Sequence, residues 1–349
     1  MLPTATTATT ADNAPDANPA AASALRRTSP SWRVWLGTAG GVFLGLVLLV
    51  AAWAKALDPP AFAEQIQAEG LAVFGLSAGA VALIALGLEV GLGLALVLGI
   101  RRPWVLVPAT LLVAFFVFLT GRAYWRDLQG IAAPEAAGCG CFGNLVQRTP
   151  AEAFWQDLAM LVPPLLLAWT GRRGGRTFPP LRTGLVAVLT LAALGFAWKA
   201  PDLPQLDDVA TRLKPGVKLA EICAGEGPET ICLDTLAPEL RQGEHLVVIT
   251  PLSHPEIEVF AAEFNAYVEA GKEPPLTVLS SATAEEHFEF TFRHGPVFRL
   301  VEVPAVLLRP LYRRPPRAFA VRDGVVTETP RDDLHTVLSP PRHPPYSSN

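Results

Sequence analysis

The four cysteines are the residues whose types and spacing could do chemistry. Cys139 and Cys141 lie one residue apart in the run GCGCFGN, whereas Cys223 and Cys232 bracket the run AGEGPETI. A C-x-C pair offers thiolates for disulfide exchange, or two soft ligands for a metal such as Cu(I). No histidine or further cysteine lies nearby in the sequence to complete a tetrahedral site, so we expect no metal there.

We favour a redox pair at Cys139 and Cys141, with a structural disulfide, a metal-binding pair and inert thiols as the alternatives. A disulfide between them would close a ring with only Gly140 in between. Such a tight ring is expected to be strained, and strained disulfides are the more easily reduced, regulatory or catalytic ones. The glycines of the run permit the backbone angles that closing the ring requires. Cys139 and Cys141 are therefore the predicted catalytic residues.

Cys223 and Cys232 are predicted to flank a hairpin loop. In an oxidising compartment they would pair as a structural disulfide. The alternative is a relay, in which this pair exchanges electrons with Cys139 and Cys141. A fixed disulfide and a relay look the same in sequence, so both interpretations stay open.

Three charged residues accompany apolar segments. Glu89 lies inside one of them, where an ionisable group costs about 2.5 kcal/mol or more and is a candidate functional residue. The alternative is a neutral glutamate hydrogen-bonded between helices. Lys55 and Asp58 follow another apolar segment and could be functional, or simply a snorkelling lysine and a turn at a helix end.

The elements that must position these residues divide the chain in two. Of the 349 residues, 50% are hydrophobic and only 17% are charged, and the mean hydropathy is +0.33. The apolar excess is concentrated between Val34 and Trp198, whereas the chain from Ala200 onward reads as a water-soluble domain. The net charge of -4 gives no reason to expect a nucleic-acid partner.

The predicted organisation has four parts. Residues 1–32 are rich in Ala, Thr and Pro and are expected to be a disordered cytoplasmic tail. Residues 33–171 form a membrane domain, 172–200 a cytoplasmic loop and a fifth transmembrane helix, and 201–349 an extracytoplasmic domain. The first apolar run is too long for a cleaved signal peptide.

Five membrane crossings are predicted, each as a helix: Val34–Trp53, Val73–Ile100, Trp104–Thr120, Phe154–Trp169 and Thr183–Trp198. The fourth is short and contains Pro163 and Pro164, which favour a kink. Arginines gather before the first span, between the second and third, and between the fourth and fifth. This distribution predicts a cytoplasmic N-terminus and places both cysteine pairs outside, provided that the fourth segment crosses.

The soluble part has the order of a thioredoxin-like fold. We expect a strand at His245–Thr250, a helix over about 255–270, a strand at Leu276–Ser280, and a hairpin in PPRAFAVRDGVVTET. This order resembles thioredoxins, in which Pro316 would be the cis-proline before the last hairpin. The resemblance ends at the position where a thioredoxin carries its C-x-x-C motif.

Ser253 and Glu256 stand approximately where the two cysteines of a thioredoxin would be, which excludes dithiol exchange at that position. His254 between them is expected to be a solvated loop histidine, with ligand binding as the alternative. The fold would then serve as a docking surface for a partner.

The membrane half resembles the MauE/DoxX family. The resemblance covers about residues 34–170 and is carried by WAKALDPPAF with Lys55, Asp58, Pro59 and Phe62, by LEVGLGLALVLG with Glu89, and by CGCFG. It implies a four-helix membrane bundle, comparable with vitamin K epoxide reductase-like bundles. It also implies a link to disulfide formation in the small subunit of methylamine dehydrogenase, alongside a thioredoxin-like partner protein.

The predicted function is therefore assistance with thiol–disulfide exchange or electron transfer at a bacterial inner membrane. Arg148 or the start of the fourth span could lower the pKa of the thiols, which is normally about 8.5. The expected partners are a periplasmic thiol protein or substrate protein and membrane lipids, and analogy with the bundle suggests a quinone as the terminal electron carrier. The alternative is a non-enzymatic scaffold whose disulfides are only structural.

Overall fold

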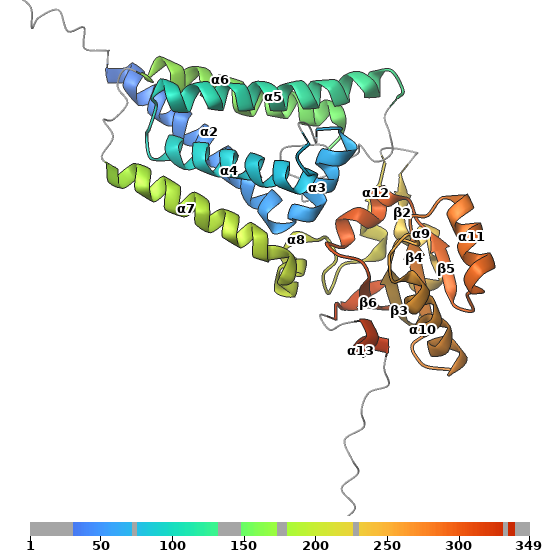
Figure 1. Cartoon of the computed structure of the whole chain (residues 1–349). Helices are drawn as coiled ribbons and strands as arrows, with labels where there is room; N and C mark the ends of the chain where they lie inside the picture. Colours follow the sequence, from blue (N-terminus) through green and yellow to red (C-terminus); the bar gives the residue numbers. More distant parts are fainter. Residues whose placement is uncertain are drawn as a thin grey trace, which may run out of the picture.

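The computed structural model describes residues 31–71, 75–131, 148–172, 180–225, 230–330 and 334–338. Figure 1 shows two regions side by side, a bundle of long helices and a smaller α/β region. Residues 1–30 of the predicted tail and the predicted pair Cys139 and Cys141 lie outside the described residues, whereas Ser31 and Trp32, also assigned to the tail, begin the first helix.

Five long helices of the described residues correspond to the five predicted spans: α2 (Ser31–Leu57), α4 (Ala78–Val97), α5 (Pro103–Leu128), α6 (Pro150–Thr170) and α7 (Pro180–Lys199). Four of them, α2, α4, α5 and α7, are long and apolar enough to cross a membrane. The second begins later than predicted, because the Ser77 hydroxyl accepts a hydrogen bond from Ala80 N and caps α4.

Helix α6 is not among those four, yet it packs against α2 and α5 and runs alongside α5 (Figure 1). It continues as a helix through Pro163 and Pro164. Its acidic Asp157 is 2% exposed and faces the interior of the bundle. One of the charged residues that lower the hydropathy of α6 is thus hidden inside the bundle, whereas Glu152 and Gln156 are exposed.

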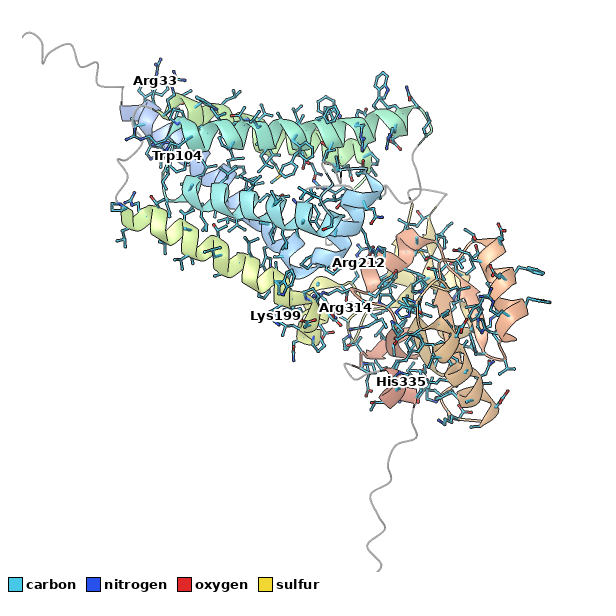
Figure 2. All side chains as sticks on the ribbon, viewed as in Figure 1. Arg33, Trp104, Lys199, Arg212, Arg314 and His335 are labelled. Atoms are coloured by element: carbon cyan, nitrogen blue, oxygen red, sulfur yellow. A yellow bond between two sulfur atoms is a disulfide. The ribbon has the colours of Figure 1, made fainter. Side chains whose placement is uncertain are left out.

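The two ends of the bundle differ in the residues and elements that they carry. Figure 2 places Arg33 and Trp104 at one end, the arginine end, and Lys199 at the other. The second end is the junction end, where α7 continues into η4 (Ala200–Asp202) and a short helix, α3 (Pro59–Ala68), contacts η4. The α/β region lies at the junction end (Figure 1).

Backbone contact at glycines holds α2 against its neighbours. A Cβ atom added at Gly37 would lie 2.4 Å from the Cα of Gly171, just past α6, and one at Gly45 would lie 2.6 Å from the carbonyl oxygen of Gly93 on α4. Small residues allow helices to approach this closely inside a bilayer, where apolar burial gives little net attraction.

The α/β region is built on a five-stranded sheet in the order β5-β4-β3-β6-β7. The strands are β3 (Glu244–Ile249), β4 (Leu276–Ser280), β5 (Arg299–Glu302), β6 (Arg317–Arg322) and β7 (Val325–Glu328). β3, β4 and β5 are parallel, and β6 runs antiparallel to both β3 and β7. The helices on the sheet are α10 (Ile257–Glu269), α11 (Ala284–His294) and α13 (Leu334–Leu338).

The predicted strand, helix, strand and hairpin are confirmed as β3, α10, β4 and β6–β7. The hairpin turns at Asp323 and Gly324, which have φ angles of 51° and 76°, as an Asp-Gly turn requires. The Pro315–Pro316 peptide bond is cis, as the resemblance implied. Helix α11 and strand β5 were not predicted, and they stand between β4 and the hairpin.

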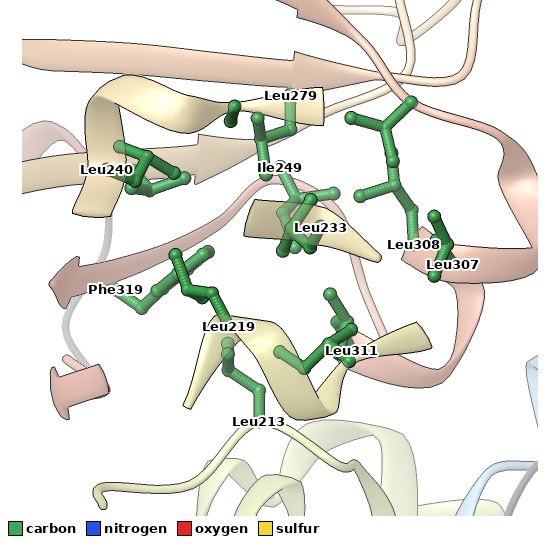
Figure 3. Close-up of a cluster of buried hydrophobic side chains, with 14 of the residues drawn as sticks. Leu213, Leu219, Leu233, Leu240, Ile249, Leu279, Leu307, Leu308, Leu311 and Phe319 are labelled. Atoms are coloured by element: carbon green, nitrogen blue, oxygen red, sulfur yellow. The ribbon is translucent and has the colours of Figure 1, made fainter. Parts of the chain in front are cut away.

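Apolar clusters cover both faces of this sheet. Val247 and Ile249 of β3 face a cluster of leucines from short elements together with Phe319, part of which Figure 3 shows. Leu246 and Val248 face the aromatic side chains of α10 and α11. A strand buried on both faces reads as a continuous apolar run, which is why β3 was predictable.

The remaining short elements of this region are η5 (Pro204–Leu206), α8 (Asp207–Ala210), η6 (Leu219–Glu221), β1 (Cys223–Ala224), β2 (Ile231–Cys232), α9 (Leu233–Leu236), η8 (Pro238–Arg241), α12 (Ala305–Leu308) and η9 (Arg309–Leu311).

Candidate functional site

The segment that contains Cys139 and Cys141 lies outside the described residues, but its two flanks are described. Ile131 follows α5 and Arg148 precedes α6, and the end of α5 and the start of α6 lie at the junction end (Figure 1). Helix α6 begins there with a capping box between Thr149 and Glu152.

Arg148, predicted to lower the pKa of the thiols, contacts a carboxylate. Its Nη1 atom lies 3.3 Å from Asp157 Oδ1 and 3.3 Å from Gln156 Oε1, and both charged side chains of the ion pair are buried. A buried ion pair thus stands at the start of α6, next to the segment of the predicted catalytic pair.

Cys223 and Cys232 face each other across the two-stranded sheet of β1 and β2. Their sulfur atoms are 2.01 Å apart, at disulfide distance, and both residues are half-buried. β1 also contacts α12. The predicted hairpin and its pairing are therefore present, whereas the choice between a structural disulfide and a relay remains a prediction.

Lys55 and Glu89 form an ion pair between α2 and α4, and the sequence did not predict this pairing. Their side chains are 3% and 0% exposed, so the snorkelling interpretation of Lys55 is wrong. The ammonium lies 4.8 Å from the ring centre of Phe116 and 5.1 Å from that of Phe62. Glu89 hydrogen-bonds between helices, as its alternative interpretation held, but its partner is a lysine.

Asp58 is the N-cap residue of α3, a short helix that was not predicted from the sequence. Its Oδ1 atom accepts a hydrogen bond of 3.2 Å from Ala61 N, and Pro59 occupies the first helical position. The signal was present, because an aspartate followed by proline is typical of a helix start. Burial raises the pKa of Asp58, and nearby Arg313 and Arg309 partly offset that rise.

A cluster of arginines joins the bundle to the α/β region. Arg309 of η9 forms an ion pair with Glu64 of α3. Arg313 donates to the carbonyl oxygens of Ala200, at 2.6 Å, and Leu203, at 3.1 Å, just after α7.

The Asp207 carboxylate, which follows η5, accepts from both Arg313 and Arg317. These contacts could not be predicted from the sequence, because the paired residues are separated by more than 100 positions. They fix the α/β region, and the hairpin of Cys223 and Cys232 within it, at the junction end.

The loop after β3 contains Ser253, His254 and Glu256, as predicted. His254 Nδ1 accepts a hydrogen bond of 3.2 Å from Glu256 N, and its ring lies 5.3 Å from that of Phe260. Within the described part of the chain, no three His, Cys, Asp or Glu side chains are grouped so that they could hold a metal ion.

Comparison with known proteins bears on the bundle alone. No curated protein matches the chain. The family model of methylamine utilisation protein MauE matches residues 33–170 of the chain. This segment covers α2, apart from its first two residues, through α6, and it excludes α7 and the α/β region. Together with the apolar helices, this match indicates a membrane protein whose bundle is similar to the MauE family.

Proposed function

We propose that the protein assists thiol–disulfide exchange at a bacterial inner membrane, with Cys139 and Cys141 as the exchanging pair. The observation that carries the proposal is that the described flanks of the first pair and the region that holds the second pair share one end of the bundle. The described flanks of the first pair lie at the junction end of the bundle, and the α/β region that holds the second pair lies at the same end.

The proposed orientation places the arginine end in the cytoplasm. Arg33, Arg101, Arg102, Arg172 and Arg182 flank the helices at that end, and basic residues of short loops favour the cytoplasmic side. The junction end and both cysteine pairs then face the periplasm, where disulfides persist.

The proposed reaction is the oxidation of a substrate dithiol. A substrate thiolate attacks one sulfur of the Cys139–Cys141 disulfide, forms a mixed disulfide and releases the other cysteine as a thiolate. The second substrate thiolate then breaks the mixed disulfide, so the substrate gains a disulfide and the pair gains two electrons. A quinone could take up these two electrons with two protons, forming a quinol and restoring the Cys139–Cys141 disulfide.

The α/β region is proposed to be thioredoxin-like and to dock a partner protein. The order β4-β3-β6-β7 with α10 between β3 and β4 supports this. The absence of cysteine at positions 253 and 256 makes dithiol exchange in that loop impossible. Cys223 and Cys232 are the cysteines of this region that a relay would use.

The substrate is proposed to be a periplasmic enzyme that needs disulfides, such as methylamine dehydrogenase. Only the description of the matching family supports this choice. The exchange chemistry itself depends on the cysteines and does not depend on which protein is the substrate.

The test is to trap the mixed disulfide. In cells that express Cys141→Ser, the Cys139 thiolate can attack the disulfide of an oxidised partner, the reverse of the second step, and displace one partner thiolate. Residue 141 then has no thiol to break the mixed disulfide, so the partner should remain attached through a bond that reductant cleaves. The matched controls are Cys139→Ser, which tests the opposite order of attack, and the double variant, which should trap nothing.

The scaffold alternative gives a different result. If neither single variant traps a protein, and if all four cysteines keep one redox state under oxidising and reducing growth, the disulfides are structural. Membrane-impermeant maleimide, applied to intact spheroplasts after reduction, checks the orientation separately. Labelling of Cys139 and Cys141 without Cys223 and Cys232 would place the two pairs on opposite sides.

A further inference from the structure

A crevice between three helices of the bundle has no part in the proposed thiol chemistry. It encloses about 250 Å³ and is lined by α4, α5 and α7. Gly87 and Gly91 of α4 contribute to its wall and lie beside Leu194 and Thr190 of α7. Helix α7 otherwise stands at the periphery of the bundle (Figure 1).

The lining is suited to an alkyl chain. Apart from the hydroxyl of Thr183 and the indole of Trp104, the residues around the crevice are apolar or glycine, and none carries a charge. The polar ring of a quinone would therefore meet few hydrogen-bonding groups there. An acyl chain needs none.

Arginines surround the crevice at the arginine end. Arg182 immediately precedes Thr183 of the lining, and its Nη1 atom donates to the carbonyl oxygen of Leu98 at 3.3 Å, which spans α7 and the end of α4. Arg102 precedes α5, is exposed and makes no side-chain cap hydrogen bond. Within the described residues, no carboxylate forms an ion pair with either arginine.

A third arginine adds to this charge. Arg101 is 3% exposed, and its buried Nε has no hydrogen-bond partner. Its side chain packs against Gly41 of α2, and it is not among the residues that line the crevice. Among the described residues, the arginine end thus presents positive charge without paired carboxylates beside an apolar crevice.

We propose that this crevice binds an anionic phospholipid, with one acyl chain between α5 and α7 and the headgroup phosphate at Arg102 and Arg182. An acyl chain gains little on leaving the bilayer for an equally apolar crevice. Selectivity must therefore come from the charge of the headgroup, which favours an anionic phospholipid over a zwitterionic lipid or an uncharged isoprenoid quinone. The bound lipid fills the gap beside α7, the helix that leads to the α/β region.

The experiment uses the full chain in detergent and native mass spectrometry, titrated separately with phosphatidylglycerol, phosphatidylcholine and ubiquinone. We expect one phosphatidylglycerol per chain to bind at least about tenfold more tightly than phosphatidylcholine, and the preference to weaken with salt. Arg102→Gln with Arg182→Gln should weaken phosphatidylglycerol about 25-fold and leave phosphatidylcholine unchanged.

A matched pair of variants on α7 tests the position of the chain. Ala187→Phe fills the crevice and should abolish tight binding, whereas Val188→Phe, on an exposed residue outside the lining, should preserve it. Thermal unfolding of both variants checks that they fold. If Ala187→Phe does not fold, the double arginine variant still tests the proposal.

Three outcomes overturn the proposal. One is equal binding of the two phospholipids. Another is a preference for phosphatidylglycerol that survives the loss of both arginines. The third is ubiquinone that displaces the phospholipid and depends on residue 187 but not on the arginines, which would make the crevice a quinone site.

Discussion

Different kinds of contact stabilise the bundle and the α/β region. In the bundle, glycines bring helix backbones together, and an ion pair between Lys55 and Glu89 lies fully inside. In the α/β region, apolar clusters cover both faces of the sheet, and a disulfide-distance cysteine pair fixes a short hairpin. The difference follows from the solvent, because apolar burial drives folding in water but gives helices little attraction in lipid.

This comparison predicts the largest effect at the buried ion pair. Glu89→Ala leaves the Lys55 ammonium buried without its carboxylate and should lower the free energy of unfolding by about 3–5 kcal/mol. Replacing both partners with apolar residues, as in Lys55→Met with Glu89→Leu, should recover most of that loss. Thermal unfolding of the purified protein in detergent measures both. A double variant as unstable as the single one would mean that the pair is needed for more than charge balance.

The next largest effect is expected at the glycine contact between α2 and α4. In Gly45→Val, the Cβ atom would lie 2.6 Å from the backbone oxygen of Gly93, so the helices must separate. We expect a loss of about 3 kcal/mol, at the upper end of overpacking costs. The matched control is Gly184→Val on α7, where an added Cβ meets no atom within 4 Å. Equal unfolding temperatures for the two variants would contradict the close packing of α2.

In the α/β region, the corresponding test is Cys223→Ser with Cys232→Ser. A disulfide that closes a loop of this size contributes about 2–3 kcal/mol. The double variant should therefore unfold at a lower guanidinium concentration, while Lys55 and Glu89 remain paired in the bundle. Guanidinium unfolding of the full chain, followed by intrinsic fluorescence, measures the loss. An unchanged midpoint would remove the structural role and favour the relay.

The smallest effect is expected at the junction of the two regions. Because burial raises the pKa of Asp58 above 3.8, the folded protein holds this proton more tightly than the unfolded chain. The free energy of unfolding should then rise as the pH falls through the raised pKa and level off below the ordinary value. Asp58→Asn keeps a good N-cap and should lose this contribution. Unfolding temperatures from pH 7 to about 4 would measure it, and parallel profiles for both proteins would exclude Asp58 as the source.

Much of the fold could be predicted from local patterns. Long apolar runs indicated the helices of the bundle, and the continuous apolar run of β3 and the Asp-Gly turn at 323 and 324 indicated the sheet. Helix α11 was missed because its exposed Phe288 and Phe292 obscure the amphipathic pattern. Strand β5 was missed because it is four residues long at the edge of the sheet.

The candidate site was less predictable, because its partners are distant in sequence. Lys55 and Glu89 were each singled out, but pairing them requires knowing how α2 packs on α4. The same holds for Arg309 with Glu64 and for Arg313 with Asp207, which depend on how the two regions dock. Cys139 and Cys141 lie outside the described residues, so their role rests on the spacing of the sequence.

The central claim is that Cys139 and Cys141 exchange electrons, and a redox titration tests it most directly. The Cys223→Ser, Cys232→Ser variant leaves these two as the remaining cysteines. It would be equilibrated in detergent with glutathione buffers, and maleimide gel shift would count the free thiols. We predict reversible oxidation of both thiols together, with a potential above about -300 mV, the value below which structural disulfides lie. Thiols that stay reduced at every ratio, or a disulfide that resists strong reductant, would contradict the account.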